Sequence, residues 1–268
     1  MNKQTMLAIV VVLVLAAVAY FLAANKADSP TPADIDVSEL TLGDEKVLPV
    51  ITPIAHASFV LTWDDLVIYN DPVSAEAFAG QPAADILLVS DVHGDHLNIE
   101  ALEALVGEDT AFIVPQAVAE ELPEDLQAKA MVVVNGQLIR NPGFGIEITA
   151  IPMYNLETQG IEIRHEAGRG NGYLLEKDGA RIYIAGDTAD IPEMRSLTDI
   201  DVAFVPMNLP YTMSVEDAAS GVAAFKPVQV YPYHYRTPDG PADVALFKQL
   251  VNEAAPEVEV VQLDWYPE

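Results

Sequence analysis

The 268-residue sequence contains no cysteine, which excludes disulfide bridges and thiolate metal sites. Any metal that this chain binds must therefore be held by nitrogen and oxygen donors. The absence of cysteine does not decide the cellular compartment, because a chain without thiols tolerates oxidising and reducing conditions alike.

Basic residues are also scarce: 13 Lys and Arg stand against 41 Asp and Glu, which gives a formal net charge of −28. A surface this acidic repels phosphate backbones, and the sequence has no basic stripe to release their counterions. We therefore do not expect nucleic acid as a partner. Solubility explains the charge, although an acidic binding face would give the same count.

One long uncharged run stands near the start, at residues 6–24 (MLAIVVVLVLAAVAYFLAA). As a helix it would span roughly 28 Å, close to the hydrocarbon thickness of a membrane. Lys3 and the amino terminus precede it, so the domain that follows is expected on the periplasmic side. Two interpretations stay open: residues 1–24 are an uncleaved membrane anchor, or a signal peptide whose removal releases the protein to the periplasm.

Residues 25–45 are polar, acidic and interrupted by two prolines, so they are expected to form a flexible linker. Hydrophobic residues make up 51% of the chain, enough for the remaining residues, 46–268, to bury a large core. Their pattern predicts an α/β domain of short strands alternating with helices. Strands are expected at 47–54, 57–63, 66–69, 86–90, 111–114, 131–134, 146–151, 173–176, 181–185, 202–206 and 228–233, and helices over 97–105, 118–130, 215–225 and 242–253.

The densest group of candidate ligands contains two of the five histidines. Asp91-Val92-His93-Gly94-Asp95-His96 places four potential ligands within six residues, at the end of the predicted strand 86–90 and the start of the helix after it. Such side chains in one exposed turn would repel one another without a cation, so a metal site is expected. Asp187 and His234 also follow predicted strands, where open α/β sheets place their sites. Zinc, manganese or iron suits these donors, and hydrolysis is the expected chemistry.

These motifs resemble the metallo-β-lactamase superfamily, whose signature is HxHxDH. The resemblance runs from about residue 50 to residue 235 and is most similar to a bacterial branch of ascorbate-6-phosphate lactonase-like and phospholipase-D-like hydrolases. The matching segments are Ala55-His56-Ala57-Ser58-Phe59, Asn70-Asp71-Pro72, the loop Asp91 to His96, His165 before the glycine-rich residues 168–173, Gly186-Asp187-Thr188, and Tyr233-His234-Tyr235.

The resemblance implies a four-layer αββα sandwich over residues 46–268, preceded by the apolar N-terminal helix. It also implies two divalent transition-metal ions, zinc or else manganese or iron, that hold a hydroxide for attack on an ester, lactone or phosphodiester bond. Asp95 would in addition be catalytic, orienting the hydroxide and passing a proton to the leaving group. The implied ligands are Asp91, His93 and His165 for the first metal and Asp95, His96 and His234 for the second, with Asp187 bridging both.

One position departs from the signature, because Asp91 stands where the superfamily has its first histidine. A carboxylate can still bind zinc and suits manganese or iron better than imidazole does, so the site can be retained. Alternatively, Asp91 only supports the other ligands, and the first site is weak or empty.

The remaining site predictions concern support and substrate. His56 and Asp71 are expected to support the ligands rather than bind metal, with His56 hydrogen-bonded near Asp71 or a ligand carboxylate. Residues 153–164 are a candidate flap over the metals. Five residues near the ligand motifs could contact an anionic, small or lipid-like substrate: Tyr154, Asn155, Arg164, Tyr211 and Arg236.

Two other functions stay open at this stage. A non-catalytic metal-binding protein on the same fold would explain the aspartate at position 91, although the other ligand positions are all filled. A nucleic-acid-processing member of the superfamily is disfavoured by the acidic charge.

Overall fold

A computed structural model describes residues 46–141 and 143–266. The predicted membrane segment at 1–24 and the linker at 25–45 lie outside the described residues, so both stay predictions. Among the residues described, no helix is both long enough and apolar enough to cross a membrane.

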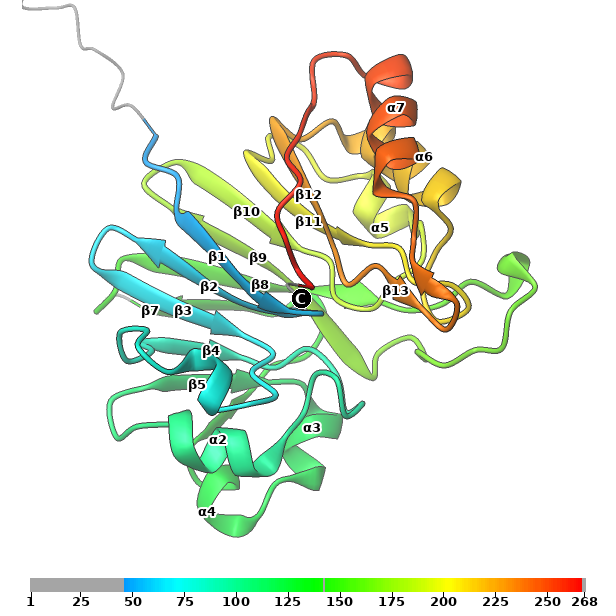
Figure 1. Ribbon diagram of the computed structural model, residues 1–268. Helices are drawn as coiled ribbons and strands as arrows, with labels where there is room; N and C mark the ends of the chain where they lie inside the picture. The colour runs from blue at the N-terminus through cyan, green and yellow to red at the C-terminus, as the bar shows by residue number, and fades with distance from the viewer. Residues whose placement is uncertain (1–45, 142, 267–268) are drawn as a thin grey trace, which may run out of the picture. The chain divides into compact units, whose positions relative to one another are not determined.

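Two β-sheets face each other across the core (Figure 1). The first has the strand order β1-β2-β3-β4-β5-β6, and the second has the order β15-β12-β11-β10-β9-β8-β7. The strands of the first sheet are β1 (Val50–Ala55), β2 (Ser58–Trp63), β3 (Leu66–Asn70), β4 (Ile86–Leu88), β5 (Ala111–Val114) and β6 (Ala130–Val132). Those of the second are β7 (Leu138–Asn141), β8 (Ile146–Met153), β9 (Gly170–Lys177), β10 (Ala180–Ile184), β11 (Val202–Pro206), β12 (Gln229–Tyr233) and β15 (Glu259–Val260). A small ribbon pairs β13 (Arg236–Thr237) with β14 (Gly240–Pro241).

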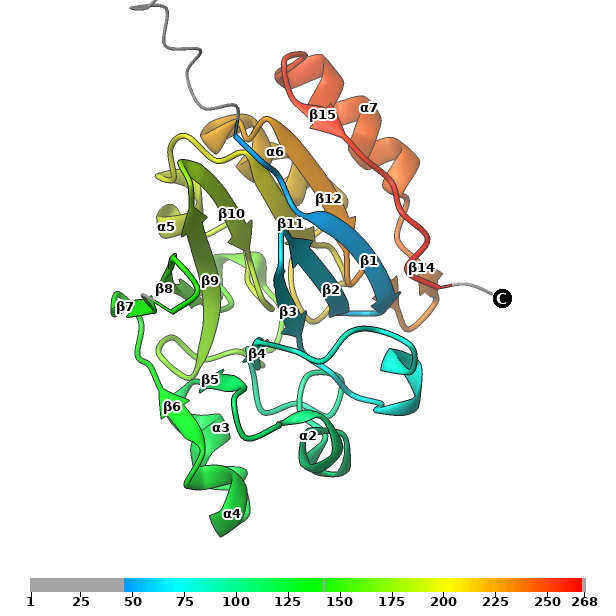
Figure 2. The ribbon, with the colours of Figure 1, turned by 90° about the vertical axis from the view of Figure 1, so that its left-hand side faces the viewer.

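Helices cover the outer faces of the two sheets, so the elements stack as helices, sheet, sheet and helices (Figures 1 and 2). The first sheet carries α2 (Ile99–Leu105), α3 (Gln116–Glu121) and α4 (Glu124–Gln127), and the second carries α5 (Pro192–Arg195), α6 (Val215–Phe225) and α7 (Val244–Ala254). Two short 3₁₀ helices, η2 (Glu76–Phe78) and η3 (Glu157–Gln159), lie in loops.

Strand β2 shows how the sequence produces this stacking. Phe59, Leu61 and Trp63 are fully buried in the cluster that also contains the second sheet. Val60, on the opposite face of the same strand, belongs to a cluster with Leu102 of α2. Alternate side chains of a strand point to opposite faces, so an apolar run such as SFVLTW is buried on both sides. The described residues therefore form a mixed α/β fold, which confirms the predicted fold class, and its helices are few.

Most of the predicted strands are confirmed, but the predicted helix over 118–130 is wrong. It is divided into α3 and α4, because Leu122 and Pro123 are extended between them. A residue before proline is disfavoured in the helical region, so Leu122 ends α3, and Pro123 is the N-cap residue of α4. Residue Ala130 already belongs to β6. Strands β7 and β15 were not predicted, since both are short strands at the edges of the second sheet.

Candidate metal centre

Loops that follow strands of both sheets carry the predicted ligands. Asp91 comes shortly after β4, Asp187 shortly after β10, and His234 directly after β12, whereas His165 lies in the connection from β8 to β9. Gly186 allows the turn before Asp187, since its φ is +66° and a Cβ there would lie 2.6 Å from the Sδ of Met153. Both the backbone conformation and the close packing require glycine at this position.

Asp95 and His96 lie in a tight turn before α2, which corrects the prediction that they begin the helix. The backbone N–H groups of His96 and Leu97 both donate to the carbonyl of His93, at 2.9 and 2.8 Å. Helix α2 starts only afterwards, with the Asn98 side chain accepting from the N–H of Ala101. The turn brings His93 and His96 back over the ends of the strands.

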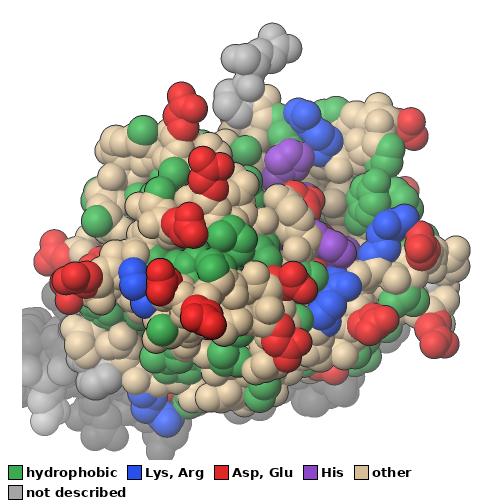
Figure 3. All heavy atoms as spheres, turned by 90° about the horizontal axis from the view of Figure 1, so that it is seen from below, with side chains coloured by type: hydrophobic (Ala, Val, Ile, Leu, Met, Phe, Trp, Pro, Cys, Tyr) green, Lys and Arg blue, Asp and Glu red, His purple; other side chains and the backbone are tan. Residues whose placement is uncertain are grey.

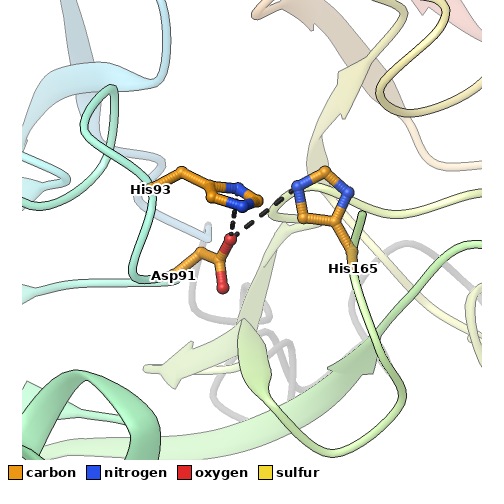
Figure 4. Close-up of side chains that lie close together, drawn as sticks. All are labelled: Asp91, His93 and His165. Atoms are coloured by element: carbon orange, nitrogen blue, oxygen red, sulfur yellow. Dashed lines mark ion pairs between the residues drawn. The ribbon is translucent and has the colours of Figure 1, made fainter. Parts of the chain in front are cut away.

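The first cluster contains Asp91, His93 and His165 (Figure 4). The Oδ2 atom of Asp91 lies 2.8 Å from Nδ1 of His93 and 3.7 Å from Nε2 of His165. The candidate ligand atoms of the three side chains lie within 4.8 Å of one another, close enough for one ion.

The second cluster contains Asp95, His96 and His234. The Nε2 atoms of His96 and His234 are 3.2 Å apart, and Oδ2 of Asp95 lies 3.3 Å from Nε2 of His234. His96 and His234 are almost completely buried, whereas 45% of the Asp95 side chain is exposed. The cluster therefore has a buried floor and one carboxylate that faces solvent.

Asp187 lies between the two clusters and contacts both. Its Oδ2 is 3.1 Å from Nε2 of His165 and 3.2 Å from Nε2 of His96, and its Oδ1 is 3.4 Å from Nε2 of His234. The structure thus brings together all seven residues that the sequence analysis expected as ligands.

The donor atoms of the site fit a metal ion. Within the described part of the chain, Nε2 of His165 and Oδ1 of Asp187 are buried and form no hydrogen bond. A buried polar atom without a partner costs about 1–3 kcal/mol, so natural sites seldom leave two such atoms side by side. Imidazole nitrogen and carboxylate oxygen are the ligands that zinc, manganese and iron accept.

Residues 50–234 match the family model of the β-lactamase superfamily domain. The chain belongs to the metallo-β-lactamase superfamily. A UPF0173 metal-dependent hydrolase of Pelotomaculum thermopropionicum is 32% identical to this member over 222 residues, which are 78% of the chain and 94% of the relative. A second one, from Thermococcus onnurineus, is 29% identical over 211 residues, 75% of the chain and 92% of the relative.

Solved structures resemble this superfamily member as well. A crystal structure assigned as a metal-dependent hydrolase from Parabacteroides distasonis has 37% identity and a TM-score of 0.69, and the match covers 80% of this chain and 92% of that one. Igni18, a metallo hydrolase of the archaeon Ignicoccus hospitalis, has 24% identity and a TM-score of 0.66 over 80% and 94% of the two chains, which shows the shared fold. This member of the metallo-β-lactamase superfamily is therefore an enzyme of the metal-dependent hydrolase class.

Asp71 supports the second cluster of this superfamily member. The fully buried Oδ2 of Asp71 lies 2.9 Å from Nδ1 of His96 and accepts from the Ser90 hydroxyl at 2.7 Å, while Oδ1 accepts from the Ser90 N–H at 2.7 Å. With a proton on Nδ1 held by Asp71, the Nε2 of His96 is directed at Asp187. Ser90 was not expected in this role.

His56 supports the site through contacts other than the expected hydrogen bond near Asp71 or a ligand carboxylate. Its contacts are with His234 and Tyr266 rather than Asp71: its backbone carbonyl accepts from the N–H of His234 at 3.2 Å, and its Nδ1 lies 3.4 Å from the Tyr266 hydroxyl. The two imidazole rings meet edge to face with centroids 5.7 Å apart. Burial and the neighbouring His234 lower the pKa of His56, which favours a neutral ring.

Buried charges shift the pKa values of the second cluster. Burial alone would lower the pKa of His96, but the carboxylates of Asp187 and Asp71 outweigh it and raise that pKa well above its ordinary value. Burial would raise the pKa of Asp187, yet His234 and His96 hold it well below its ordinary value. Burial would also raise the pKa of Asp95, but its contact with His234 and the charge of His96 lower that pKa. In the metal-free protein, a proton on His96 thus compensates the carboxylates.

Metal binding at neutral pH is expected to release about one proton, because a metal ligand must be the neutral imidazole. The apparent metal affinity should then rise about tenfold per pH unit for each displaced proton, until the pH passes the raised pKa of His96. Calorimetric titration with Zn²⁺ in buffers of different ionisation enthalpy counts the protons. Binding without proton release, at an affinity that does not depend on pH, would contradict this expectation.

The same shifts determine how the stability of the metal-free protein depends on pH. The raised pKa of His96 gives a stabilisation that is complete below the ordinary histidine pKa and is lost as the pH rises through the raised value. The lowered pKa values of Asp95 and Asp187 give a second stabilisation. It is complete above the ordinary carboxyl pKa and is lost as the pH falls toward the lowered values. The contribution of these three groups to the free energy of unfolding should therefore be greatest between about pH 4 and pH 6.5, which chemical denaturation of the metal-free protein across this range measures.

A pocket of about 160 Å³ lies at the two clusters. On one face of the molecule, histidine and basic side chains lie near one another, and acidic side chains are scattered over the same face (Figure 3). Of the five predicted substrate contacts, Arg164 and Tyr211 line the pocket, and the Arg164 guanidinium lies over the Tyr211 ring at 5.4 Å. The residues that line the pocket are His93, Asp95, Arg164, His165, Asp187, Asn208 and Tyr211.

The other three predicted substrate contacts do not line the pocket. The Tyr154 hydroxyl donates to Glu193 at 2.9 Å, and the Arg236 guanidinium stacks on the Tyr266 ring at 4.4 Å. The Asn155 side chain accepts from the N–H groups of Arg164 and His165, at 2.8 and 2.9 Å. Asn155 therefore holds the loop of a candidate ligand and is not itself directed at substrate. The movement of residues 153–164 as a flap stays a prediction.

Two site residues were missed by the sequence analysis. Asn208 lines the pocket, and its Nδ2 lies 3.3 Å from Nδ1 of His234. Its position just after β11 was the available signal, since that strand end lies beside those of β10 and β12. Arg169 pairs with Asp91 through both carboxylate oxygens, at 3.0 and 2.8 Å. Nothing local in the sequence links these two residues, which are 78 positions apart.

Proposed function

We propose that the protein uses bound metal to hydrolyse an ester, lactone or phosphodiester bond in a small or lipid-like molecule. The observation that carries the proposal is the position of Asp187, a buried carboxylate within 3.4 Å of histidines from both clusters. The relatives of this protein in Pelotomaculum thermopropionicum and Thermococcus onnurineus are named metal-dependent hydrolases, which supports the reaction class.

The residues that would hold metal are those of the two clusters, with Asp187 shared between them. A divalent ion bound there supplies a Lewis acid for the scissile bond and lowers the pKa of water, the nucleophile. Zinc suits these donors, and the carboxylate at position 91 also permits manganese or iron.

Asp95 is the residue proposed to move the proton. Its pKa lies below the ordinary value, so it is ionised at neutral pH, and the carboxylate is the form that can orient the attacking water and take up its proton. Nearly half of its side chain is exposed, and it lines the pocket, so it can reach both the water and the leaving group. The protonated carboxyl would then return that proton to the leaving oxygen.

Arg164 and Tyr211 are proposed to bind the substrate. Both line the pocket, and the exposed guanidinium of Arg164 pairs with the exposed Glu162 at 2.6 Å, a contact that solvent weakens. An anionic group of the substrate can therefore replace Glu162. The volume of about 160 Å³ admits only the reacting part of a substrate, so the remainder of a lipid-like molecule would extend outside.

Location and partners also belong to the proposal. We expect the apolar segment 6–24 to anchor the enzyme in the membrane with its catalytic domain on the periplasmic side, or to direct its secretion to the periplasm. The net charge of −28 supports a small or lipid-like substrate over nucleic acid.

Removal of metal from the full-length protein by a chelator is expected to abolish hydrolysis, and stoichiometric Zn²⁺ or Mn²⁺ should restore it. His96→Ala should lower the rate by more than about 100-fold, because His96 is a buried member of the second cluster. The measurements are metal content and initial rates on a panel of esters, lactones and phosphodiesters. Metal binding without any hydrolysis would support the non-catalytic alternative, and an undiminished rate in His96→Ala would refute the assigned site.

A further inference from the structure

The Asp91 carboxylate forms an ion pair with the side chain of Arg169. Arg169 donates from Nε to Oδ1 at 3.0 Å and from Nη2 to Oδ2 at 2.8 Å, a two-point pair with a carboxylate that is fully buried. The same Nη2 lies 3.5 Å from Nε2 of His93. A permanent positive charge therefore lies against two of the three members of the first cluster.

The second cluster has no such cation. Within residues 46–141 and 143–266, neither Asp95 nor Asp187 forms an ion pair with Lys or Arg, and the ion pairs of both are with histidines. A further buried carboxylate, Asp71, lies behind His96. The two clusters thus differ in charge: Arg169 neutralises Asp91 of the first, whereas Asp95 of the second, together with the shared Asp187, remains available to a dication.

We propose that the two clusters bind metal unequally, with one divalent ion held tightly by the second cluster and Arg169 weakening the first. The proposal rests on the proposed function, since it concerns the same metal centre. A dication in the first cluster must share the Oδ2 of Asp91 with the guanidinium and bear its repulsion at short distance. Arg169 therefore supplies, as a fixed charge, part of what a second ion would supply.

This inequality explains why aspartate can stand at position 91. A histidine there would bring Arg169 against a neutral ring, without a partner for its charge. An aspartate instead forms a buried two-point pair, which fixes both side chains whether or not metal is present.

Titration of metal-free, full-length protein with Zn²⁺, followed by metal analysis after gel filtration, tests the proposal. The wild type should retain one equivalent, and a second equivalent should bind at least about 100-fold more weakly. Arg169→Gln should strengthen the weaker site at least tenfold. The matched control is Arg164→Gln, which removes an arginine that lines the same pocket but pairs with Glu162, and it should leave both affinities unchanged.

A second pair of variants covers the case in which Arg169→Gln does not fold. Asp95→Asn should lose the tight equivalent, whereas Asp91→Asn should keep it. Two equivalents of equal affinity in the wild type, or loss of the tight equivalent in Asp91→Asn, would overturn the proposal and leave the proposed function standing. A wild type that binds no metal would instead overturn the proposed function.

Discussion

Asp187→Asn is expected to reduce hydrolysis by more than about 100-fold and to remove tightly bound metal. Asparagine has the size of aspartate but not its charge, and the buried carboxylate of Asp187 lies within 3.4 Å of His96, His165 and His234. The amide would place a neutral group, with a donor at one end, where a cation must bind. The loss should therefore affect both clusters at once.

The matched control for Asp187→Asn is Asp178→Asn, the same substitution at the other end of β10. Asp178 lies in the turn between β9 and β10, its side chain is 69% exposed, and its φ of +49° is one that asparagine adopts readily. Its rate and metal content should match the wild type. If Asp187→Asn kept one tight equivalent and a rate within tenfold of the wild type, the shared role of Asp187 would be wrong.

Asp71→Ala is expected to lower the free energy of unfolding of the metal-free protein by about 3–5 kcal/mol, because it leaves the buried, protonated His96 without one of its carboxylates. Asp71→Asn should fold better, because asparagine tolerates the φ of +44° at this position. Its amide cannot hold the His96 ring as a carboxylate does, so metal affinity should still fall by about 10–100-fold.

Chemical denaturation of the metal-free proteins and competition with a chromogenic chelator give these two quantities. Asp64→Ala is the control for backbone strain, since Asp64 also has a positive φ (+54°) but is 47% exposed and pairs with Lys177 at the surface. It should cost at most about 1–2 kcal/mol and leave metal affinity unchanged. Equal losses in Asp64→Ala and Asp71→Ala would mean that strain, and not the contact with His96, accounts for the effect.

The sequence predicted those parts of the fold in which local pattern and burial agree. Runs such as residues 86–88 and 202–206 are buried on both faces, and their continuous apolar composition is itself the signal of a central strand. The edge strand β7 has only intermediate or exposed residues, so no pattern identified it. In the segment 118–130, apolar spacing favoured one helix, and the restriction that Pro123 imposes on Leu122 outweighed it.

In the candidate site, too, some residues could be predicted from the sequence, whereas others depend on tertiary packing. The ligand residues are few and chemically distinctive, and it was the resemblance to the superfamily that predicted that Asp91, His165 and Asp187 come together. Tyr154 and Asn155 were expected to face substrate, but side-chain direction depends on packing: Tyr154 turns to Glu193, and Asn155 holds the loop of His165. The pairing of Arg169 with Asp91 depends wholly on tertiary structure.

The ligands are contributed from both sides of the core: four follow β4 of the first sheet, and His165, Asp187 and His234 come from loops of the second. A bound ion therefore connects the two sheets as a clamp. At a thousandfold excess of free metal over its dissociation constant, binding would add about 4 kcal/mol to stability. Copies that receive no metal would open more often and be degraded first, so the supply of metal would set the lifetime of the enzyme and hence its abundance.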